Sequence, residues 1–114
     1  MSRARSASPA YLTDAAPLFA ALGDETRLGV VARLCREGPL SIARLSEDAE
    51  VTRQAITKHL EALAGAGLVR DTRRGRERIW ELEPRRLEVA RRCLERISTQ
   101  WDSALERLRE FVEE

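Results

Sequence analysis

The sequence predicts a mainly α-helical domain of about five helices that also contains a two-stranded β-hairpin. Three observations support this prediction: several segments with apolar residues at helical spacing end at a glycine, two apolar runs flank a glycine-bearing turn within residues 68–82, and no glycine or proline follows Pro84. A short helix, a turn, a second helix and a basic hairpin occur in that order within residues 41–82. This order is the layout of a winged helix-turn-helix, a scaffold that can place one helix in the major groove of DNA.

Length and composition limit what else the chain can be. Its 114 residues suit one domain with a core just large enough to be stable alone or, more readily, as a dimer, and they leave no room for a second, catalytic domain. No apolar run approaches the roughly 18 residues that span a bilayer, and no apolar stretch follows the basic N-terminus as a secretory signal requires. We therefore expect a cytoplasmic protein that does not bind membranes.

Positive charge is concentrated in one part of the chain. The net charge is only +1, but residues 53–78 carry seven basic groups against three acidic ones, whereas the segments before and after them are slightly acidic. The basic groups are Arg53, Lys58, Arg70, Arg73, Arg74, Arg76 and Arg78. Affinity for nucleic acid depends on local contacts that release counterions, so a basic patch on a nearly neutral chain is typical of phosphate binding.

The first elements are an arm and two helices. Residues 1–10 are mostly small and polar, which predicts a disordered N-terminal arm ahead of a domain over residues 11–83. A first helix is expected over residues 14–22, with an apolar face formed by Leu18, Phe19 and Leu22. Asp24 is a suitable N-cap for a second helix that runs to about Glu37, with an apolar face formed by Leu28, Val31, Leu34 and Cys35.

The next two helices form the helix-turn-helix. Ser41 can cap a third helix over about residues 41–48, and Thr52 can cap a fourth, the recognition helix, over about residues 52–65. At about 100° per residue, one side of the fourth helix is mainly apolar and the other polar: Thr52, Ile56, Leu60 and Leu63 against Gln54, Thr57, Lys58 and Glu61. The polar side predicts contacts with DNA, in which Gln54 pairs with adenine, Arg53 or Lys58 with guanine, and Thr57 with a phosphate or a thymine. An ordinary solvated face is the alternative.

The hairpin, over about residues 68–82, is expected to form the wing. Trp80 and Leu82 fall on the same side of the returning strand and should pack inward, which leaves the turn in solvent. The turn contains Arg73, Arg74 and Arg76, whose mutual repulsion a polyanion would relieve. Exposed arginine turns without a role also occur, so the preceding helix pair is what favours DNA contact here.

Residues 84–114 are expected to form a C-terminal dimerisation helix, because Pro84 suits its first position and apolar residues then recur at heptad spacing. A helix of about 29 residues would reach about 43 Å, which is longer than so small a domain can cover alone. Part of the apolar stripe should therefore pack against a second copy of the chain, helped by the first helix. The expected interface residues are Leu18, Leu94, Ile97, Trp101, Ala104, Leu105, Leu108 and Phe111.

Several motifs, in this order and spacing, resemble the ArsR family of bacterial winged-helix repressors. They lie within about residues 18–82 and are Leu22-Gly23-Asp24-Glu25-Thr26-Arg27, Val51-Thr52-Arg53-Gln54-Ala55-Ile56-Thr57-Lys58-His59-Leu60, Ala66-Gly67-Leu68-Val69, Arg73-x-Gly75-Arg76 and Trp80-x-Leu82. The resemblance implies a homodimer that binds an inverted repeat in double-stranded DNA, a palindromic operator, and blocks transcription. His59 matches a histidine common in the family, for which we expect a packing or phosphate role. The expected DNA-binding residues are Thr52, Arg53, Gln54, Thr57, Lys58, His59, Arg73, Arg74 and Arg76.

Many members of that family release DNA when a metal binds, and this sequence departs from them. The expected third helix has no thiol where the best-known Cys-x-Cys site would lie, and the last helix has no histidine, so neither a metal nor a cofactor is expected. The run from Trp101 to Leu108 resembles a metal-independent branch of the family. A few relatives sense oxidants through cysteines on the second and last helices, the elements that hold Cys35 and Cys93. We expect these to be buried structural thiols, with a redox-responsive repressor as the alternative.

Proteins of other classes are less compatible with the sequence. An enzyme is not expected, because the single histidine lies on the expected recognition helix and no paired acids mark a catalytic pocket. The stronger alternative is a protein-interaction module, which would use the same fold and bind another protein through its helical stripe. The effector, if there is one, is not identified by any motif.

Overall fold

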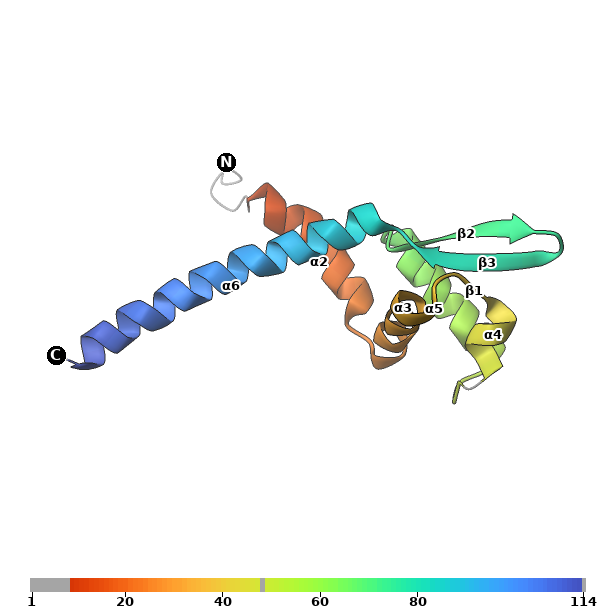
Figure 1. Cartoon of the computed structure of the whole chain (residues 1–114), viewed down its shortest axis with the longest axis horizontal. Coiled ribbons are helices and arrows are strands. Elements are labelled where there is room, and N and C mark those ends of the chain that lie inside the picture. The colour runs from red at the N-terminus through yellow and green to blue at the C-terminus, as the bar shows by residue number, and fades with distance from the viewer. Residues whose placement is uncertain (1–8, 48, 114) are drawn as a thin grey trace, which may run out of the picture.

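The computed structural model describes residues 9–47 and 49–113, which contain five helices and three short strands. In chain order these are α2 (Ala10–Leu22), α3 (Glu25–Glu37), β1 (Leu40–Ser41), α4 (Ile42–Glu47), α5 (Arg53–Gly65), β2 (Val69–Arg74), β3 (Glu77–Leu82) and α6 (Pro84–Glu113). The β2–β3 hairpin projects from one end of the helical body, and α6 extends from the other end (Figure 1). The predicted winged helix-turn-helix architecture is confirmed, while residues 1–8 of the expected arm lie outside the described residues.

Side-chain caps begin three helices where the sequence predicts them. Each cap accepts a hydrogen bond from a backbone N–H three residues further along the chain, which satisfies a donor that the helix leaves without a partner. The donor and acceptor pairs are Arg27 to Asp24 Oδ2 at 3.1 Å, Arg44 to Ser41 Oγ at 3.2 Å and Ala55 to Thr52 Oγ1 at 3.1 Å. The starts of α3, α4 and α5 therefore follow from local sequence.

The first helix, α2, begins four residues earlier than predicted. Its first turn forms after Pro9, whose carbonyl accepts a hydrogen bond from the backbone N–H of Thr13 at 3.1 Å. Helix α6 holds this turn, because the Arg96 guanidinium lies 4.1 Å from the centre of the Tyr11 ring and Gln100 Nε2 donates to the Tyr11 hydroxyl at 3.2 Å. These contacts join residues about 85 positions apart, so a local pattern could not reveal the extra turn.

The core is formed by the facing sides of the helices and the base of the wing. Its fully buried large side chains are Leu18, Ile56, Leu60, Leu63 and Leu68. The apolar side predicted for α5 is confirmed at Ile56, Leu60 and Leu63, whereas Thr52 is exposed. Leu18 was expected at the dimer interface, but its side chain has no exposed surface in the single chain. We therefore correct its assignment from the interface to the core.

The buried face of α3 differs from the expected one. Val30, Val31 and Leu34 are buried, but Leu28 is 51% exposed and Cys35 is exposed. At about 100° per residue, Leu28 and Cys35 lie roughly 100° round the helix from the centre of the buried face, so they turn to solvent. The expectation of a buried thiol is thus wrong for Cys35 and confirmed for Cys93 on α6.

The wing belongs to a three-stranded antiparallel sheet with the order β1-β3-β2. The two-residue strand β1, which the sequence did not predict, places Leu40 opposite Trp80 of β3 and continues directly into α4. Trp80 is buried and Leu82 packs against the core, as predicted. Gly75 has a φ of +63° at the start of the two-residue turn, a conformation that favours glycine. Because β1 joins β3 to α4, the wing is held against the helix-turn-helix.

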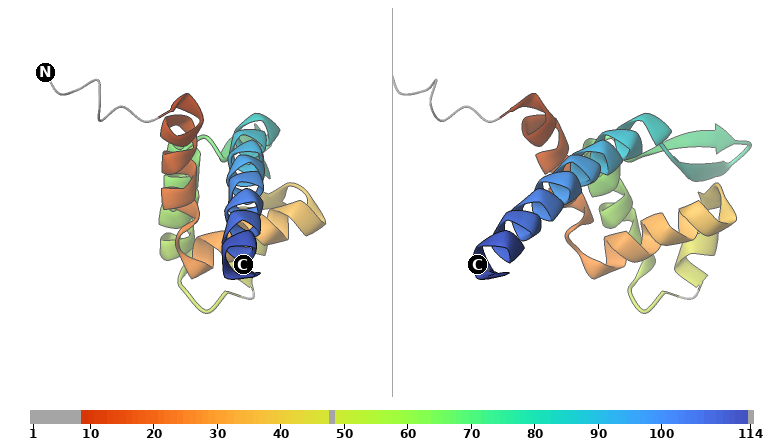
Figure 2. Two further views of the ribbon diagram at one scale, coloured as in Figure 1. Left: turned by 90° about the vertical axis from the view of Figure 1, so that its left-hand side faces the viewer. Right: turned by 60° about the vertical axis from the view of Figure 1, so that its left-hand side comes forward.

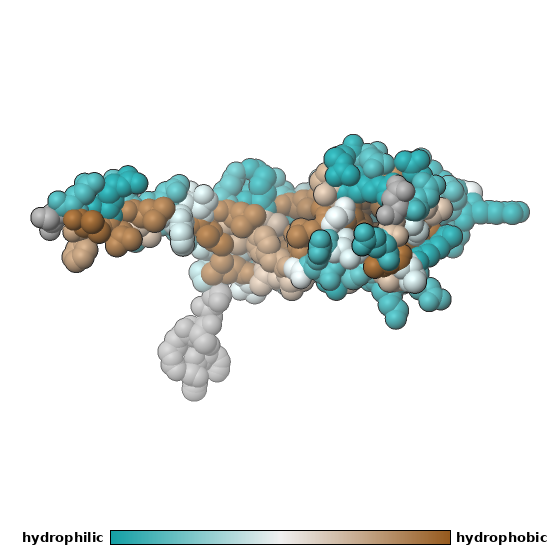
Figure 3. Space-filling model, turned by 90° about the horizontal axis from the view of Figure 1, so that it is seen from below, coloured by the Kyte–Doolittle hydropathy of each residue, from teal (hydrophilic) through white to brown (hydrophobic). Residues whose placement is uncertain are grey.

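The last helix, α6, has 30 residues, so it is about 45 Å long, and only its first half packs along α2 (Figures 1 and 2). From Leu94 onward every described residue is exposed. The large apolar side chains among them are Leu94, Ile97, Trp101, Leu105, Leu108, Phe111 and Val112, which we call the α6 stripe. Brown, apolar residues gather along one side of this part of the helix (Figure 3). None of the described helices is long and apolar enough to cross a membrane.

Candidate nucleic-acid interface

The N-terminal half of α5 presents polar side chains to solvent. Ile56 on its inner side is buried in the core, and this anchoring turns the opposite side outward. Arg53, Gln54 and Lys58 are exposed on that side, and Thr57 is half-buried. The Thr57 hydroxyl donates to the Arg53 carbonyl at 3.0 Å, which leaves its oxygen able to accept a further hydrogen bond. The helix thus offers the donors and acceptors that a groove in DNA requires.

The tip of the wing carries the arginines Arg73, Arg74 and Arg76, and all three are exposed. Within residues 9–47 and 49–113, the basic side chains of these three arginines, Arg53 and Lys58 form neither an ion pair nor a hydrogen bond. These five cations, which we call the open cations, keep their full charge for an external anion.

The other two basic groups of this segment are neutralised within the wing. Arg70 donates to Glu83 Oε2 at 2.6 Å and to Glu81 Oε2 at 3.2 Å, and the hydrogen bond with Glu81 is the main cause that raises the pKa of Arg70. Arg78 Nε donates to Asp71 Oδ2 at 2.8 Å. The positive surplus of the segment therefore lies on the open cations and not evenly along the chain.

A hollow of about 290 Å³ brings the helix-turn-helix and the wing together. Arg53 reaches it from α5, while Arg73 and Arg76 reach it from the wing. The remaining lining residues are Ser41, Ile42, Ala43, Glu77 and Arg78. Three of the open cations thus surround one concave surface, although they come from segments about 20 residues apart. Concentrated charge of one sign in a hollow attracts a polyanion more strongly than the same charge spread over a convex surface.

His59 is half-buried on α5 and faces the start of α3. Its Nδ1 accepts a hydrogen bond from Arg27 Nε at 3.1 Å and lies 3.9 Å from Asp24 Oδ2. The backbone N–H of Arg27 is the main cause that holds the pKa of Asp24 below its usual value. These contacts join α5 to α3 and fit the packing role expected for His59. Arg27 lies in the Leu22–Arg27 motif, whose residue types alone do not reveal this contact with His59.

Possible metal ligands and the two cysteines are the remaining candidates for a reactive or ligand-binding site. Within the part of the chain that the structure describes, no group of three or more histidine, cysteine, aspartate or glutamate side chains could hold a metal ion. Cys35 is exposed on α3, and Cys93 is buried on α6 and lines a hollow shared with α2. No contact joins the two thiols among the described interactions.

Known proteins are similar to this chain in both sequence and fold. Residues 22–72 match the family model described as a helix-turn-helix domain, a range that contains α3, α4 and α5. The HTH-type transcriptional regulator Rv2034 of Mycobacterium tuberculosis is 40% identical over 85 residues, which are 75% of this chain and 76% of that protein. An ArsR-like transcriptional regulator from Rhodococcus sp. RHA1 has a solved structure with 37% identity and a TM-score of 0.73, covering 90% of this chain and 96% of that one. The chain belongs to the ArsR family.

As a member of the ArsR family, the protein is a winged helix-turn-helix DNA-binding transcriptional regulator, and its fold is one of regulators and not of enzymes. The arsenical resistance operon repressor of Escherichia coli is also similar, with 36% identity over 67 residues, 59% of this chain and 57% of that protein.

Proposed function

We propose that this ArsR-family protein is a repressor that binds an inverted-repeat operator as a homodimer. The observation that carries the proposal is the arrangement of the open cations, which lie on α5 and the wing tip and partly surround one hollow. The similarity to the arsenical resistance operon repressor of Escherichia coli supports repression of transcription and not activation. Because α4 carries no cysteine, we further infer a metal-independent branch of the family. A cytoplasmic location follows from binding to the bacterial chromosome.

The two parts of the surface have different tasks in this proposal. The start of α5 enters the major groove, where Arg53, Gln54 and Lys58 reach base edges and Thr57 reaches a phosphate or a thymine methyl group. Thr52, the cap of α5, lies beside the DNA backbone where the helix starts. His59 holds α5 against α3 through its hydrogen bond with Arg27. The wing arginines Arg73, Arg74 and Arg76 bind flanking DNA through its backbone or minor groove.

The α6 stripe supports the homodimer. Seven large apolar side chains are exposed along one helix, and monomeric soluble proteins rarely expose so long an apolar surface. A second copy of the chain would cover Leu94, Ile97, Trp101, Leu105, Leu108 and Phe111, and Ala104 would allow close approach between them. A two-fold symmetric dimer presents two recognition helices about 34 Å apart, which requires a palindromic site.

Selection of bound duplexes from a random pool, at a stated salt concentration, tests the proposal directly. The expected result is a consensus with two inverted half-sites whose centres lie about one DNA turn apart. A consensus without symmetry would contradict the homodimer, and the absence of any enrichment would contradict sequence-specific binding.

Substitutions in α5 test the assignment of base contacts. Arg53→Ala and Gln54→Ala should each reduce the preference for the consensus over a site mutated at one position, by about 1–3 kcal/mol per lost base contact. Arg92→Ala serves as the control, because it removes one exposed positive charge from α6 that is ion-paired with Glu88 and does not line the hollow between α5 and the wing. Unchanged selectivity in both α5 variants would show that other residues read the bases.

The dimer is tested by a charge placed within the stripe. Trp101→Glu should raise the dimer dissociation constant at least about tenfold, since burial of a large apolar side chain contributes roughly 1.5–3 kcal/mol. Thr99→Glu adds the same charge on another side of the same exposed helix turn and should leave the constant unchanged. Sedimentation equilibrium measures both. If the unchanged protein remains monomeric at all concentrations, the stripe instead serves a different protein, as the interaction-module alternative requires.

A further inference from the structure

A second and larger hollow lies beside the helix-turn-helix, away from the open cations. Its volume is about 630 Å³, and its walls are α3 on one side and α4, residues 49–51 and the first turn of α5 on the other. Val30, Leu45 and Ile56 give it an apolar floor, and all three belong to the core. None of the DNA-contacting residues proposed above lines it. It is therefore a separate concave site.

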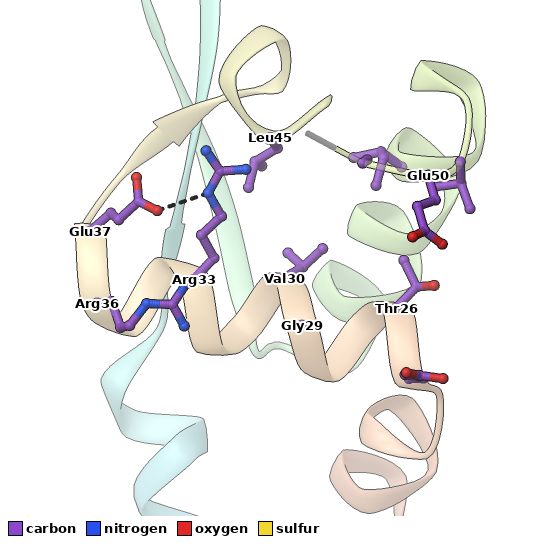
Figure 4. A pocket seen from close by; sticks show the side chains of 12 residues that line it. Thr26, Gly29, Val30, Arg33, Arg36, Glu37, Leu45 and Glu50 are labelled. Carbon is purple, nitrogen blue, oxygen red and sulfur yellow. Dashed lines mark hydrogen bonds and ion pairs between the residues drawn. The ribbon is translucent and has the colours of Figure 1, made fainter. Parts of the chain in front are cut away.

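The middle of the α3 wall is Gly29, which lies in the interior of a helix. A Cβ added at Gly29 would meet no other heavy atom within 4 Å, so packing within the chain does not require a glycine there. Apart from proline, glycine is the least favourable residue for a helix interior. Gly29 thus lines the hollow without a side chain, next to Val30 on the same helix (Figure 4).

The two ends of the hollow carry opposite charge. Arg33 and Arg36 lie at one end together with Glu37, whereas Glu50 lies with Thr26 at the other end (Figure 4). Arg33 Nε donates to Glu37 Oε2 at 2.9 Å, and this bond holds the pKa of Glu37 below its usual value, so this end keeps a surplus of one positive charge.

The acidic end is formed by Glu25 and Glu50. Neither Glu25 nor Glu50 forms an ion pair within residues 9–47 and 49–113, although both line the hollow. Glu25 and Arg36 are 11 residues apart on α3, so their Cα atoms are about 16 Å apart along the helix axis. Their long side chains extend over part of this length, which leaves room for one aromatic ring with a charged group at each end.

We propose that this hollow is an effector site, and that it binds a small dipolar molecule with an apolar body, an anionic group at one end and an ammonium group at the other. The inference rests on the proposed repressor function. The anionic group would meet Arg36, the ammonium group Glu25 and Glu50, and the apolar body the floor around Val30. A ligand with only one charge leaves the opposite end of the hollow without a partner.

An occupant of this hollow would act on the recognition helix directly. Val51 lines the hollow and immediately precedes Thr52, the cap of α5, and Ile56 lies in the first turns of the same helix. A molecule wedged between α3 and these residues changes the position of α5 relative to the rest of the domain. If a ligand binds more tightly with α5 in one position than in another, it favours that position. The affinity for DNA then changes by as much as the ligand's affinities for the two positions differ.

Three probes that share one ring test the chemistry: 4-(aminomethyl)benzoate, which is dipolar, 4-methylbenzoate and 4-methylbenzylamine. Binding to the full-length protein is followed by ¹⁵N NMR through the backbone amides of Val30 and Val51, which line the hollow and are present in every variant. The dipolar probe should bind at least about tenfold more tightly than either singly charged probe. Equal, weak binding of all three probes would overturn the proposed charge recognition.

Variants of the hollow separate binding from folding. Gly29→Leu fills the open space and improves helix propensity, so it should abolish binding of every probe without lowering Tm. Arg36→Gln should weaken the dipolar probe to the level of 4-methylbenzylamine, whereas Glu61→Gln on α5, which does not line the hollow, should have no effect. Binding that survives Gly29→Leu would show that the probes bind elsewhere.

The effect on DNA is measured separately by fluorescence anisotropy with the selected operator. A saturating dipolar probe should change the Kd for DNA at least about threefold in the unchanged protein and not in Gly29→Leu. A probe that binds by NMR without changing this Kd would overturn the effector role. Failure to bind DNA in the absence of any probe would instead refute the repressor proposal, because the NMR measurement does not depend on DNA.

Discussion

Separate replacement of Arg74 and Arg70 with alanine tests whether ion pairing within the wing decides which arginines bind DNA. Both residues lie on β2 and are four positions apart, so their side chains leave the same face of the strand. Arg74 is one of the open cations, whereas Arg70 is bound by Glu81 and Glu83. The two variants remove the same charge from the same strand and differ mainly in this pairing.

The expected difference can be stated as a salt dependence. Each phosphate contact contributes about 0.9 to the slope of log K against log salt concentration, and a homodimer would carry two copies of each arginine. Arg74→Ala should therefore reduce the magnitude of the slope by about 1.8, which makes the loss of affinity between about 50 and 200 mM salt roughly 12-fold smaller. Arg70→Ala should change the slope by less than about 0.5, because the carboxylates already neutralise its charge.

Fluorescence anisotropy with a labelled operator at four salt concentrations measures these slopes, and circular dichroism at each salt concentration checks that both variants are folded. Equal reductions in the two variants would refute the reasoning, because they would show that total charge governs binding and that the internal ion pairs do not. A slope unchanged by Arg74→Ala would show that the tip of the wing does not contact phosphate.

Three further predictions concern the framework that positions the surface. Leu60→Ala removes a fully buried side chain and should lower the free energy of unfolding by about 2–5 kcal/mol in urea denaturation, where a loss below 1 kcal/mol would contradict its place in the core. Thr52→Ala removes the cap of α5 and should cost about 1 kcal/mol in the same assay, whereas Thr52→Ser retains the hydroxyl and should cost much less. Asp24→Asn keeps a capping oxygen but removes the charge. Because the pKa of Asp24 is lowered in the folded protein, its contribution is complete above the ordinary value of 3.8 and is lost as the pH falls through the folded value. The difference in Tm between Asp24→Asn and the unchanged protein should thus be largest near pH 7 and vanish in acid, and a constant difference would contradict this origin.

The helix starts could be predicted from the sequence because capping is local. Asp24, Ser41 and Thr52 each accept a hydrogen bond from a backbone N–H three residues further along the chain, so donor and acceptor of each cap lie within four consecutive residues. The start of α2 could not be predicted in this way, since Tyr11 is held by Arg96 and Gln100 from the far end of the chain. Strand β1 was missed for the same reason: two residues become a strand only through their pairing with β3.

The buried face of α3 shows a second limit of sequence patterns. Helical spacing groups Leu28 and Cys35 with Leu34 in one broad apolar arc, but it does not say which part of the arc faces inward. The neighbours decide this, and α2, α5 and β3 pack against the side that carries Val30 and Leu34. The exposure of Cys35 therefore depends on tertiary packing. The same packing exposes Gly29 and forms the larger hollow, for which the sequence contains no recognisable motif.

The basic segment shows most clearly what the structure adds to the charge pattern. The sequence assigns seven cations to residues 53–78 and treats them alike. Strand pairing then places Arg70 opposite Glu81, and Arg78 close enough to bond Asp71, so these two arginines stabilise the hairpin instead of attracting an anion. The register of β2 and β3 therefore selects which arginines remain open. A one-residue slip in that register would turn every side chain of the slipped strand to the opposite face and would remove Arg70 from its place opposite Glu81.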